Sequence, residues 1–139
     1  MKVYLASPWF KNHERVMYVQ VLNKMRAQGI EVYVPMEHSI LNAWDMSNEE
    51  WGRKVFQEDL EAIQNCDEVW VLNFGMYSDS GTAWECGYAY GIGKTVRQLV
   101  AGIGKEKVFS LMMLNGCNEW DFMENYIFDR NDDYKIEQK

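Results

Sequence analysis

Short apolar segments alternate along this chain with longer segments whose apolar residues recur at helical spacing. The predicted strands are residues 2–7, 30–34, 67–73, 95–100 and 108–114. The predicted helices are residues 12–28, 47–65, 81–92 and 120–128. Strands and helices in this order favour a parallel sheet with right-handed crossovers. The sequence therefore predicts an α/β fold, a flavodoxin- or Rossmann-like three-layer sandwich with a parallel sheet of about five strands.

Local signals support the first two predicted helices. Asn12 is a candidate N-cap, and Ser47 with Glu50 forms the capping-box pattern S-x-x-E. The apolar positions of the first helix are Val16, Val19, Leu22 and Met25. The inward stripe of the second helix is predicted to contain Val55, Phe56 and Ile63. Residues 36–46, between the second strand and this helix, are expected to form an irregular loop.

Length and charge narrow the class of protein. The 139 residues predict one domain over residues 1–139. The formal net charge is -7, and no cluster of Lys and Arg is visible. A protein that binds phosphates needs a basic face, so we expect no nucleic-acid partner, whereas a neutral nucleoside remains acceptable. The longest apolar runs, such as residues 69–72, are too short to span a membrane.

Neither a metal site nor a dinucleotide site is expected. The three cysteines, Cys66, Cys86 and Cys117, form no C-x-x-C pair, and the two histidines lie far apart in sequence. Their odd number, without a secretory signal, predicts reduced thiols in a cytoplasmic protein. No G-x-G-x-x-G follows the first strand, so we expect no cofactor.

Ligands of such sheets bind at the carboxyl ends of the strands. Here those ends are residues 7–10, the polar loop 74–80, and the residues after 111. We therefore expect the functional residues in these segments and at the start of the helix that follows the polar loop.

Glu85 is the only charged residue between residues 80 and 93. The helix around it has no charged face, so it is expected to be largely buried. Glu85 shares a helix face with Gly81 and Tyr88. A buried carboxylate is either hydrogen-bonded for structural reasons or functional, since leaving it bare is costly. Pattern alone favours a functional Glu85.

Asp59 is the second acidic residue at an unexpected position. It lies four residues after Val55 and four before Ile63, within the predicted inward stripe. A partly exposed place at the edge of the stripe explains it equally well.

Asp79 and Ser80 stand just before the helix that contains Glu85, where either is a candidate N-cap. A capping role alone would explain both, although the position also points toward a ligand at the strand ends. Tyr4, in the first strand, reads as a core residue. Trp9 and Phe10 either cover a flat nucleobase or pack as a lid.

A buried Glu with partner carboxylates suits glycosyl transfer. The carboxylate attacks an anomeric carbon, and a second acceptor resolves the covalent intermediate, which predicts ping-pong kinetics. The leaving base needs a proton from an acid whose pKa is raised by burial or by a like charge. Asp79 and Asp59 are the candidates for this acid.

Three blocks of the sequence are similar to a known enzyme family. They are Val3-Tyr4-Leu5-Ala6-Ser7-Pro8-Trp9-Phe10, then Glu58-Asp59-Leu60-Glu61-Ala62-Ile63 with Cys66-Asp67-Glu68-Val69, and Asp79-Ser80-Gly81-Thr82-Ala83-Trp84-Glu85-Cys86-Gly87-Tyr88-Ala89. Together they resemble the nucleoside 2-deoxyribosyltransferase family over residues 2–100. The third block is the most specific of the three.

The resemblance implies a role for each matching residue. Glu85 is the nucleophile, Asp59 supports the sugar and proton transfer, and Asp79 contacts and helps protonate the base, while Tyr4 holds the nucleophile. The family borrows an asparagine from a neighbouring subunit, for which Asn118 is the candidate and Asn115 the rival. The predicted substrate-binding residues are Ser7, Pro8, Trp9, Phe10, Ser80, Gly81 and Asn118.

The resemblance also implies partners and rivals. The expected substrates are a deoxynucleoside and a free nucleobase, handled by a homo-oligomer whose active sites are completed across an interface. The first rival is an N-glycosidase that passes the sugar to water. Related monophosphate hydrolases have a serine where this chain has Asp79, and an aspartate would repel a phosphate. The second rival is a non-catalytic nucleotide-binding α/β module.

Overall fold

The computed structural model describes residues 1–38, 40, 42–75, 79–102 and 109–129. Five strands form one parallel sheet in the order β2-β1-β3-β4-β5. The strands are β1 (Lys2–Ala6), β2 (Glu31–Tyr33), β3 (Glu68–Asn73), β4 (Thr95–Val100) and β5 (Glu119–Phe122). The helices are α1 (Asn12–Ala27), α2 (Asn48–Asn65), α3 (Ser80–Gly91), α4 (Leu111–Asn115) and α5 (Met123–Phe128), and the 3-10 turns are η1 (Pro35–Glu37) and η2 (Ala43–Asp45).

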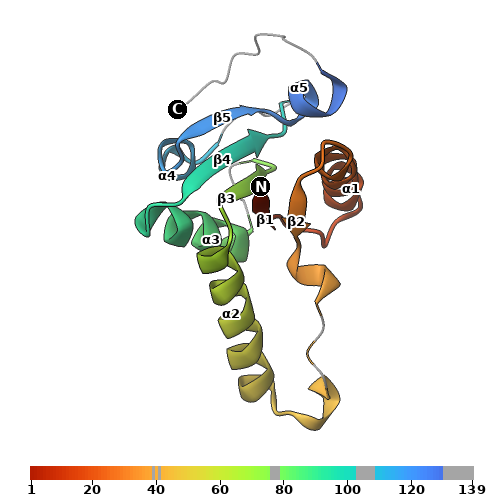
Figure 1. Ribbon diagram of the computed structural model, residues 1–139, viewed down its shortest axis with the longest axis vertical. Coiled ribbons are helices and arrows are strands. Elements are labelled where there is room, and N and C mark those ends of the chain that lie inside the picture. The colour runs from red at the N-terminus through yellow and green to blue at the C-terminus, as the bar shows by residue number, and fades with distance from the viewer. Residues whose placement is uncertain (39, 41, 76–78, 103–108, 130–139) are drawn as a thin grey trace.

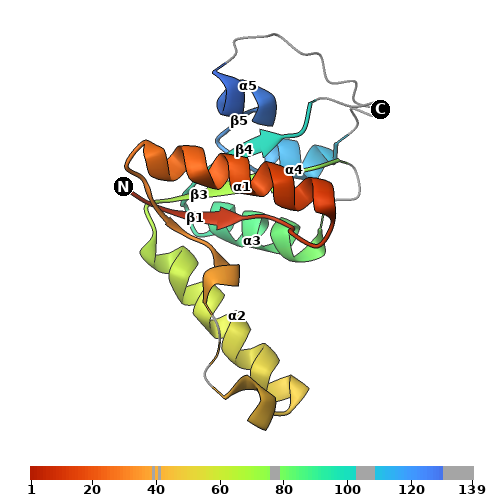
Figure 2. The same cartoon turned by 90° about the vertical axis from the view of Figure 1, so that its right-hand side faces the viewer.

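Helices cover both faces of the sheet, as Figures 1 and 2 show. One face packs against α1 and α5, and the other against α2, α3 and α4. Successive strand residues point to opposite faces. In β1, Val3 and Leu5 join the first core, whereas Tyr4 and Ala6 join the second. The predicted three-layer α/β sandwich, with its flavodoxin-like strand order, is confirmed.

The carboxyl-terminal third departs from the sequence prediction. Residues 108–114 were expected to form the fifth strand, but residues 111–115 are the short helix α4. The fifth strand is β5, which overlaps the start of the predicted helix 120–128, so that α5 begins only at Met123. A short apolar run is ambiguous between a strand and a half-buried helix, and only Met113 and Leu114 of α4 are buried. β5 is an edge strand with three exposed residues, so it lacks the apolar signature of the central strands.

The inward faces of two helices also differ from their predicted stripes. Of the predicted stripe of α1, Leu22 and Met25 are buried, whereas Val16 and Val19 are exposed. Tyr18 and Val21 are buried in their place. Lys11, not Asn12, is the N-cap of α1. The stripe of α2 is buried only at Ile63, because the amino-terminal part of this helix extends away from the sheet (Figure 1). The predicted cap of α2 is present, since the Glu50 N–H donates to Ser47 Oγ at 3.2 Å.

A row of buried amides crosses the sheet between β3 and α4. Asn73 Nδ2 donates to Gln98 Oε1 at 2.7 Å, and Gln98 Nε2 donates to the Met113 carbonyl at 2.7 Å. Asn73 Oδ1 accepts from the Gly75 N–H at 3.1 Å. Because these groups satisfy one another, Asn73 and Gln98 remain fully buried at little cost.

None of the helices within the described residues is long and apolar enough to cross a membrane.

Candidate active site

Glu85 lies on α3 and is held by a tyrosine from the neighbouring strand. Tyr4 points from β1 to the face that α3 covers, and its hydroxyl donates to Glu85 Oε2. Glu85 makes no salt bridge within the described residues. Burial raises the pKa of Glu85 to about 7, the Tyr4 hydrogen bond lowers it, and the charges of Asp59 and Asp79 raise it. The sequence-predicted pair of Glu85 and Tyr4 is thus in direct contact.

A cavity of about 430 Å³ opens over Glu85 at the carboxyl ends of β1 and β2. Its acidic lining residues are Asp59, Asp79 and Glu85. Its aromatic lining residues are Trp9, Phe10, Tyr18, Trp51 and His38. The remaining lining residues are Leu5, Ser7, Pro35, Met36, Val55 and Thr82. Three carboxylates and several flat rings therefore meet at the edge of the sheet where parallel α/β folds bind ligands.

Asp59 reaches this cavity from α2. It is half-buried, and it makes no hydrogen bond or salt bridge within the described part of the chain. Burial raises its pKa to about 6, the nearby charge of Glu58 raises it further, and His38 lowers it. A carboxyl whose pKa is raised in this way can carry a proton near neutral pH and release it to a substrate.

Asp79 caps α3 and lines the same cavity. Its Oδ2 accepts from the Thr82 N–H at 2.9 Å and from the Thr82 hydroxyl at 3.0 Å. The capping role predicted from its position is therefore present. Because both bonds use Oδ2, the cap does not engage Oδ1.

Most of the other predicted binding residues line this cavity or the hollow beside it. Ser7 lines the cavity, and its hydroxyl donates to the carbonyl of the buried Pro8 at 2.8 Å. Trp9 and Phe10 line it too, with their rings stacked at 5.2 Å between centroids. Ser80 and Gly81 line an adjoining hollow of about 570 Å³ between α2 and α3, which also reaches Asp59 and Glu85.

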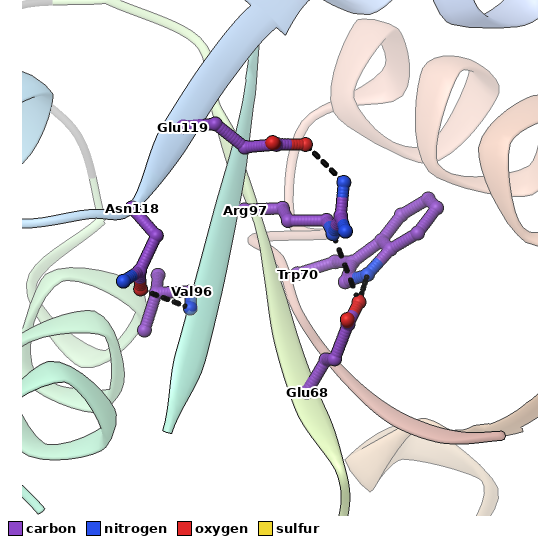
Figure 3. Close-up of polar contacts among 6 residues, drawn as sticks. All are labelled: Glu68, Trp70, Val96, Arg97, Asn118 and Glu119. Carbon is purple, nitrogen blue, oxygen red and sulfur yellow. Dashed lines mark hydrogen bonds and ion pairs between the residues drawn. The ribbon is translucent and has the colours of Figure 1, made fainter. Parts of the chain in front are cut away.

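Asn118 lies away from the cavity, just before β5 and beside the start of β4 (Figure 3). Its Oδ1 accepts from the Val96 N–H at 2.7 Å, and its own N–H donates to the Val96 carbonyl at 2.8 Å. The side chain thus aligns the entry into β5 with the amino-terminal end of β4, whereas the cavity lies at the carboxyl ends of β1 and β2. Its predicted contact with a neighbouring subunit's site stays a prediction.

The sequence prediction missed several residues that line the cavity. Trp51 and Val55 precede Asp59 on α2 at intervals of four residues, so the three share one helix face. That spacing was a readable signal. Tyr18, Pro35, Met36 and His38 carry no comparable signal, because they come from α1 and from the irregular segment after β2, whose path the sequence does not specify.

Another hollow, larger than this cavity, lies apart from it. It measures about 660 Å³ between α3 and α4, and its lining contains no carboxylate, imidazole or ammonium group. Within the described residues, no group of three His, Cys, Asp or Glu side chains is arranged to hold a metal ion. The smaller cavity, by contrast, places three carboxylates around space for a ligand, and no salt bridge within the described residues engages them.

Comparison with known proteins relates this geometry to one family. Residues 3–113 match the family model described as nucleoside 2-deoxyribosyltransferase. A 2-deoxyribosyltransferase from the psychrotolerant bacterium Bacillus psychrosaccharolyticus is 30% identical, with a TM-score of 0.79. The match covers 96% of this chain and 93% of that one. No curated protein sequence matches the chain.

Two further solved structures share the fold at lower identity. A conserved protein from Enterococcus faecalis V583 is 19% identical with a TM-score of 0.73, over 92% of this chain and 95% of that one. The CMP N-glycosidase BcmB of Clostridium botulinum is 20% identical with a TM-score of 0.63, over 93% of this chain and 97% of that one. At these identities the likeness concerns the fold alone.

Proposed function

The chain belongs to the nucleoside 2-deoxyribosyltransferase family, and from that premise we propose that it transfers 2-deoxyribose between nucleobases through a covalent deoxyribosyl-Glu85 intermediate. One observation carries the proposal. Glu85 is a half-buried carboxylate held by Tyr4 in a cavity with two further carboxylates, and no cation within the described residues pairs with it. Such a group is poorly explained by fold stability alone.

In the first half-reaction, a Glu85 oxygen attacks C1′ of the deoxynucleoside while the bond from C1′ to the base nitrogen breaks. The departing base takes a proton from Asp59, whose pKa of about 6 suits a general acid near neutral pH. Asp79, the N-cap of α3, orients the base through its Oδ1, the oxygen that does not take part in the cap.

In the second half-reaction, a nitrogen of the incoming base attacks C1′ and the bond to Glu85 breaks. The acceptor loses its N–H proton to Asp59, which restores the starting protonation state. The Tyr4 hydroxyl stabilises the ionised form of Glu85 in both its attacking and its leaving role, since the hydrogen bond lowers the pKa of that carboxyl.

Free nucleosides suit the cavity better than their monophosphates do. Among the described residues that line it there is no Lys or Arg, whereas there are three carboxylates. A dianionic phosphate would gain no cation there and would be repelled by the carboxylates. The proposed reaction needs no cofactor, because the carboxylates supply both the nucleophile and the acid.

We propose further that the chain acts as a homo-oligomer. Trp51, Phe56 and Trp84 expose large apolar side chains on α2 and α3 beside the candidate site, and the Phe56 and Trp84 rings pack edge to face at 5.3 Å. Clustered exposed aromatics are typical of protein interfaces. Light scattering coupled to size-exclusion chromatography tests this expectation, and a monomeric mass would contradict it.

The activity is tested by incubating the protein with 2′-deoxyinosine or thymidine, with and without adenine, and following the products by liquid chromatography. Deoxyadenosine that appears only when adenine is present establishes the transferase. Release of free base at the same rate with and without adenine shows an N-glycosidase instead. No product from a panel of deoxynucleosides and their monophosphates would leave the non-catalytic binding module as the better description.

A further inference from the structure

Three aromatic rings in successive contact lead from Glu85 to the cavity wall. The Tyr4 ring, whose hydroxyl donates to Glu85, stacks on Tyr33 with 5.5 Å between centroids and 16° between planes. Tyr33 in turn stacks on His38, with 4.1 Å between centroids and 11° between planes. His38 lines the cavity. The Tyr33 ring is therefore in contact with the residue that holds Glu85 and with a residue of the wall.

We propose that Tyr33 is a positioning residue for the nucleophile: its ring fixes the plane of the Tyr4 ring, and thereby the direction of the hydrogen bond to Glu85. The inference rests on the proposed function, because it takes Glu85 to be the nucleophile. It adds a residue of β2, a strand that contributes none of the predicted catalytic groups. Tyr33 is not among the described residues that line the cavity, so its effect on the reaction passes through Tyr4.

The register of the sheet places the two tyrosines side by side. Tyr4 of β1 and Tyr33 of β2 are direct partners across this parallel pair. Neighbouring strands lie about 4.8 Å apart, and partnered residues point to the same face of the sheet. Both side chains accordingly join the second core, which α2 and α3 cover. The contact is therefore set by the pairing of the backbones.

The Tyr33 ring differs in kind from the other neighbours of Tyr4. Within the described residues, it is the one aromatic ring that stacks on Tyr4. The other buried members of this core carry aliphatic or sulfur-containing side chains, among them Ile63 and Cys86. Such side chains fill space around a ring, whereas two flat rings favour a defined mutual orientation.

The plane of the Tyr4 ring matters because of the geometry of a phenol. The phenolic O–H lies in the plane of its ring through conjugation, so this plane decides where the proton points. A hydrogen bond weakens as its angle at the proton departs from linearity. A Tyr4 ring that is free to turn would therefore donate less effectively to Glu85.

Glu85 depends on this bond for its charge. Burial raises the pKa of Glu85, as do the charges of Asp59 from α2 and Asp79 at the N-cap of α3, whereas the hydrogen bond from Tyr4 lowers it. A misdirected Tyr4 hydroxyl would leave the raising influences unopposed. The pKa of Glu85 would then rise above about 7, and less of the nucleophile would be ionised at neutral pH.

Two acidic residues of α2 lie near the Tyr33 hydroxyl. Burial raises the pKa of Tyr33 above its ordinary value of 10.0, and the charges of Asp59 and Glu58 raise it further. The phenol is therefore neutral at every pH of interest, and Tyr33→Phe removes no charge from the site. We expect the ring, and not the hydroxyl, to carry the effect.

The test compares Tyr33→Phe, which keeps the ring, with Tyr33→Leu, which removes it. For Tyr33→Leu we expect the acidic limb of the pH–rate profile to move to higher pH. The rate at pH 6 should fall about three- to fivefold, the magnitude of one aromatic pair, and recover in part at higher pH. Tyr33→Phe should keep the wild-type profile. KM should change little in either variant, because neither alters a described residue of the cavity wall.

A double substitution separates an effect through Tyr4 from a general loosening of the core. In Tyr4→Phe the hydroxyl is already absent, so adding Tyr33→Leu should not move the acidic limb further. An equal further displacement in the double variant would show that Tyr33 acts independently of Tyr4, and would overturn the proposal. Tyr126→Leu is the matched control, because it removes a half-buried ring that packs on Trp70 away from the cavity. It should leave the profile unchanged.

Failure of the proposed function has a different signature. Glutamate labelled with carbon-13 in its carboxyl group reports the ionisation of Glu85 by NMR without turnover, and Glu85→Gln assigns the signal. If the wild-type protein transfers no deoxyribose, the proposed function is wrong. A higher pKa of Glu85 in Tyr33→Leu than in the wild type and Tyr33→Phe then still supports the positioning of Glu85 by Tyr33.

An unchanged pKa of Glu85 in folded Tyr33→Leu overturns the proposal. If circular dichroism shows that Tyr33→Leu does not fold, Tyr33→Met takes its place in each measurement. The longer Met side chain fills more of the space but has no flat face to set against Tyr4.

Discussion

Carboxylates in two regions of this molecule differ in whether a cationic side chain pairs with them. Where β3, β4 and β5 lie side by side, Glu68 accepts from Arg97 Nε at 2.9 Å and from Trp70 Nε1 at 3.0 Å, and Arg97 also pairs with Glu119 (Figure 3). In the cavity, Glu85 has only the neutral Tyr4 hydroxyl, and Asp59 has no hydrogen bond or salt bridge within the described residues.

Burial alone does not separate the two regions. The Glu68 side chain is 15% exposed and is therefore also largely withdrawn from water. The two carboxylates differ in the hydrogen bonds that replace the water they lose. Glu68 accepts from a guanidinium and an indole N–H. Within the described residues, Glu85 has no cationic partner and accepts only from the neutral Tyr4 hydroxyl. An uncompensated carboxylate costs stability, and it remains available to a substrate. The comparison can be tested by substituting matched residues from both regions.

The largest difference is expected in turnover. Glu85→Gln keeps the shape of the side chain but removes the nucleophile, so we expect deoxyribosyl transfer to fall by roughly 10⁴-fold or more. Glu68→Gln, the matched change in the paired region, should retain turnover within about twofold, because Glu68 lies outside the cavity. Product formation followed by chromatography measures both. Near-wild-type activity in folded Glu85→Gln would remove Glu85 from the mechanism.

The next largest effect is expected from Asp59→Asn. Loss of a general acid typically costs about 10²- to 10⁴-fold, so turnover should fall by that amount. In the wild-type protein, the pair of Glu85 and Asp59, with pKa values of about 7 and about 6, should give a bell-shaped pH–rate profile with its maximum between them. Below this window both groups are protonated and the nucleophile is lost. Above it both are ionised and the acid is lost.

Asparagine cannot donate the missing proton, so the rate of Asp59→Asn should no longer decline on the alkaline side. A variant that keeps the full bell-shaped profile would show that another group is the acid, and Asp79→Asn would then be the substitution to examine.

Stability should change in the opposite direction to activity. The folded pKa of Glu85, about 7, lies above its ordinary value of 4.5, so the folded state holds this proton more tightly than the unfolded state does. The resulting penalty is absent below pH 4.5 and complete above pH 7. Glu85→Gln should therefore raise the free energy of unfolding by up to about 3 kcal/mol at pH 8 and by little at pH 4.

Urea denaturation at the two pH values measures this difference, and Glu68→Gln serves again as the control. Because Glu68 has compensating partners, its removal should give no stabilisation at pH 8. Equal behaviour of the two variants would contradict the contrast between the regions.

A smaller effect is expected from Tyr4→Phe. Removing the hydroxyl removes the bond that lowers the pKa of Glu85, so that pKa should rise and the acidic limb of the pH–rate profile should move to higher pH. At pH 6 we expect a loss of about tenfold in rate, with partial recovery at higher pH. An unshifted acidic limb would mean that Tyr4 does not control the charge of Glu85.

The smallest effect is expected from the paired region itself. Arg97→Gln should lower the free energy of unfolding by about 0.5–1 kcal/mol, because Arg97 is 39% exposed and surface pairs are worth little. The loss should shrink in 1 M salt, where the Debye length is about 3 Å. Turnover should not change. A salt-independent loss would show that Arg97 stabilises by packing rather than by charge.

The sequence was informative where local pattern and tertiary environment agree. Glu85 is the single charge on an otherwise uncharged helix, and the contact with Tyr4 that the resemblance implied is present. The helix as a whole is not largely buried as predicted, because one of its faces is open and exposes Trp84 and Tyr90. Asp79 was predictable as a helix cap, and it fulfils that role beside the cavity. The central strands, apolar on both faces, were predictable for the same reason.

The sequence was uninformative where geometry depends on distant packing. The apolar run at 111–115 is a helix because α3 and β4 bury only Met113 and Leu114 of it. The edge strand β5 has three exposed residues, so its sequence resembles the start of the helix that follows. Tyr18 lies outside the predicted apolar stripe of the first helix, and only the structure shows that it is buried.

The buried amides of Asn73 and Gln98 have a consequence for folding. Parallel strands are joined by long crossovers, so no tight turn dictates how β3 and β4 are aligned. A slip by one residue would turn the two amides to opposite faces of the sheet and leave their polar groups unpaired, at about 1–3 kcal/mol each. The pair therefore favours the native alignment of β3 and β4 over the neighbouring one, and with it the native arrangement of the strand ends that border the cavity.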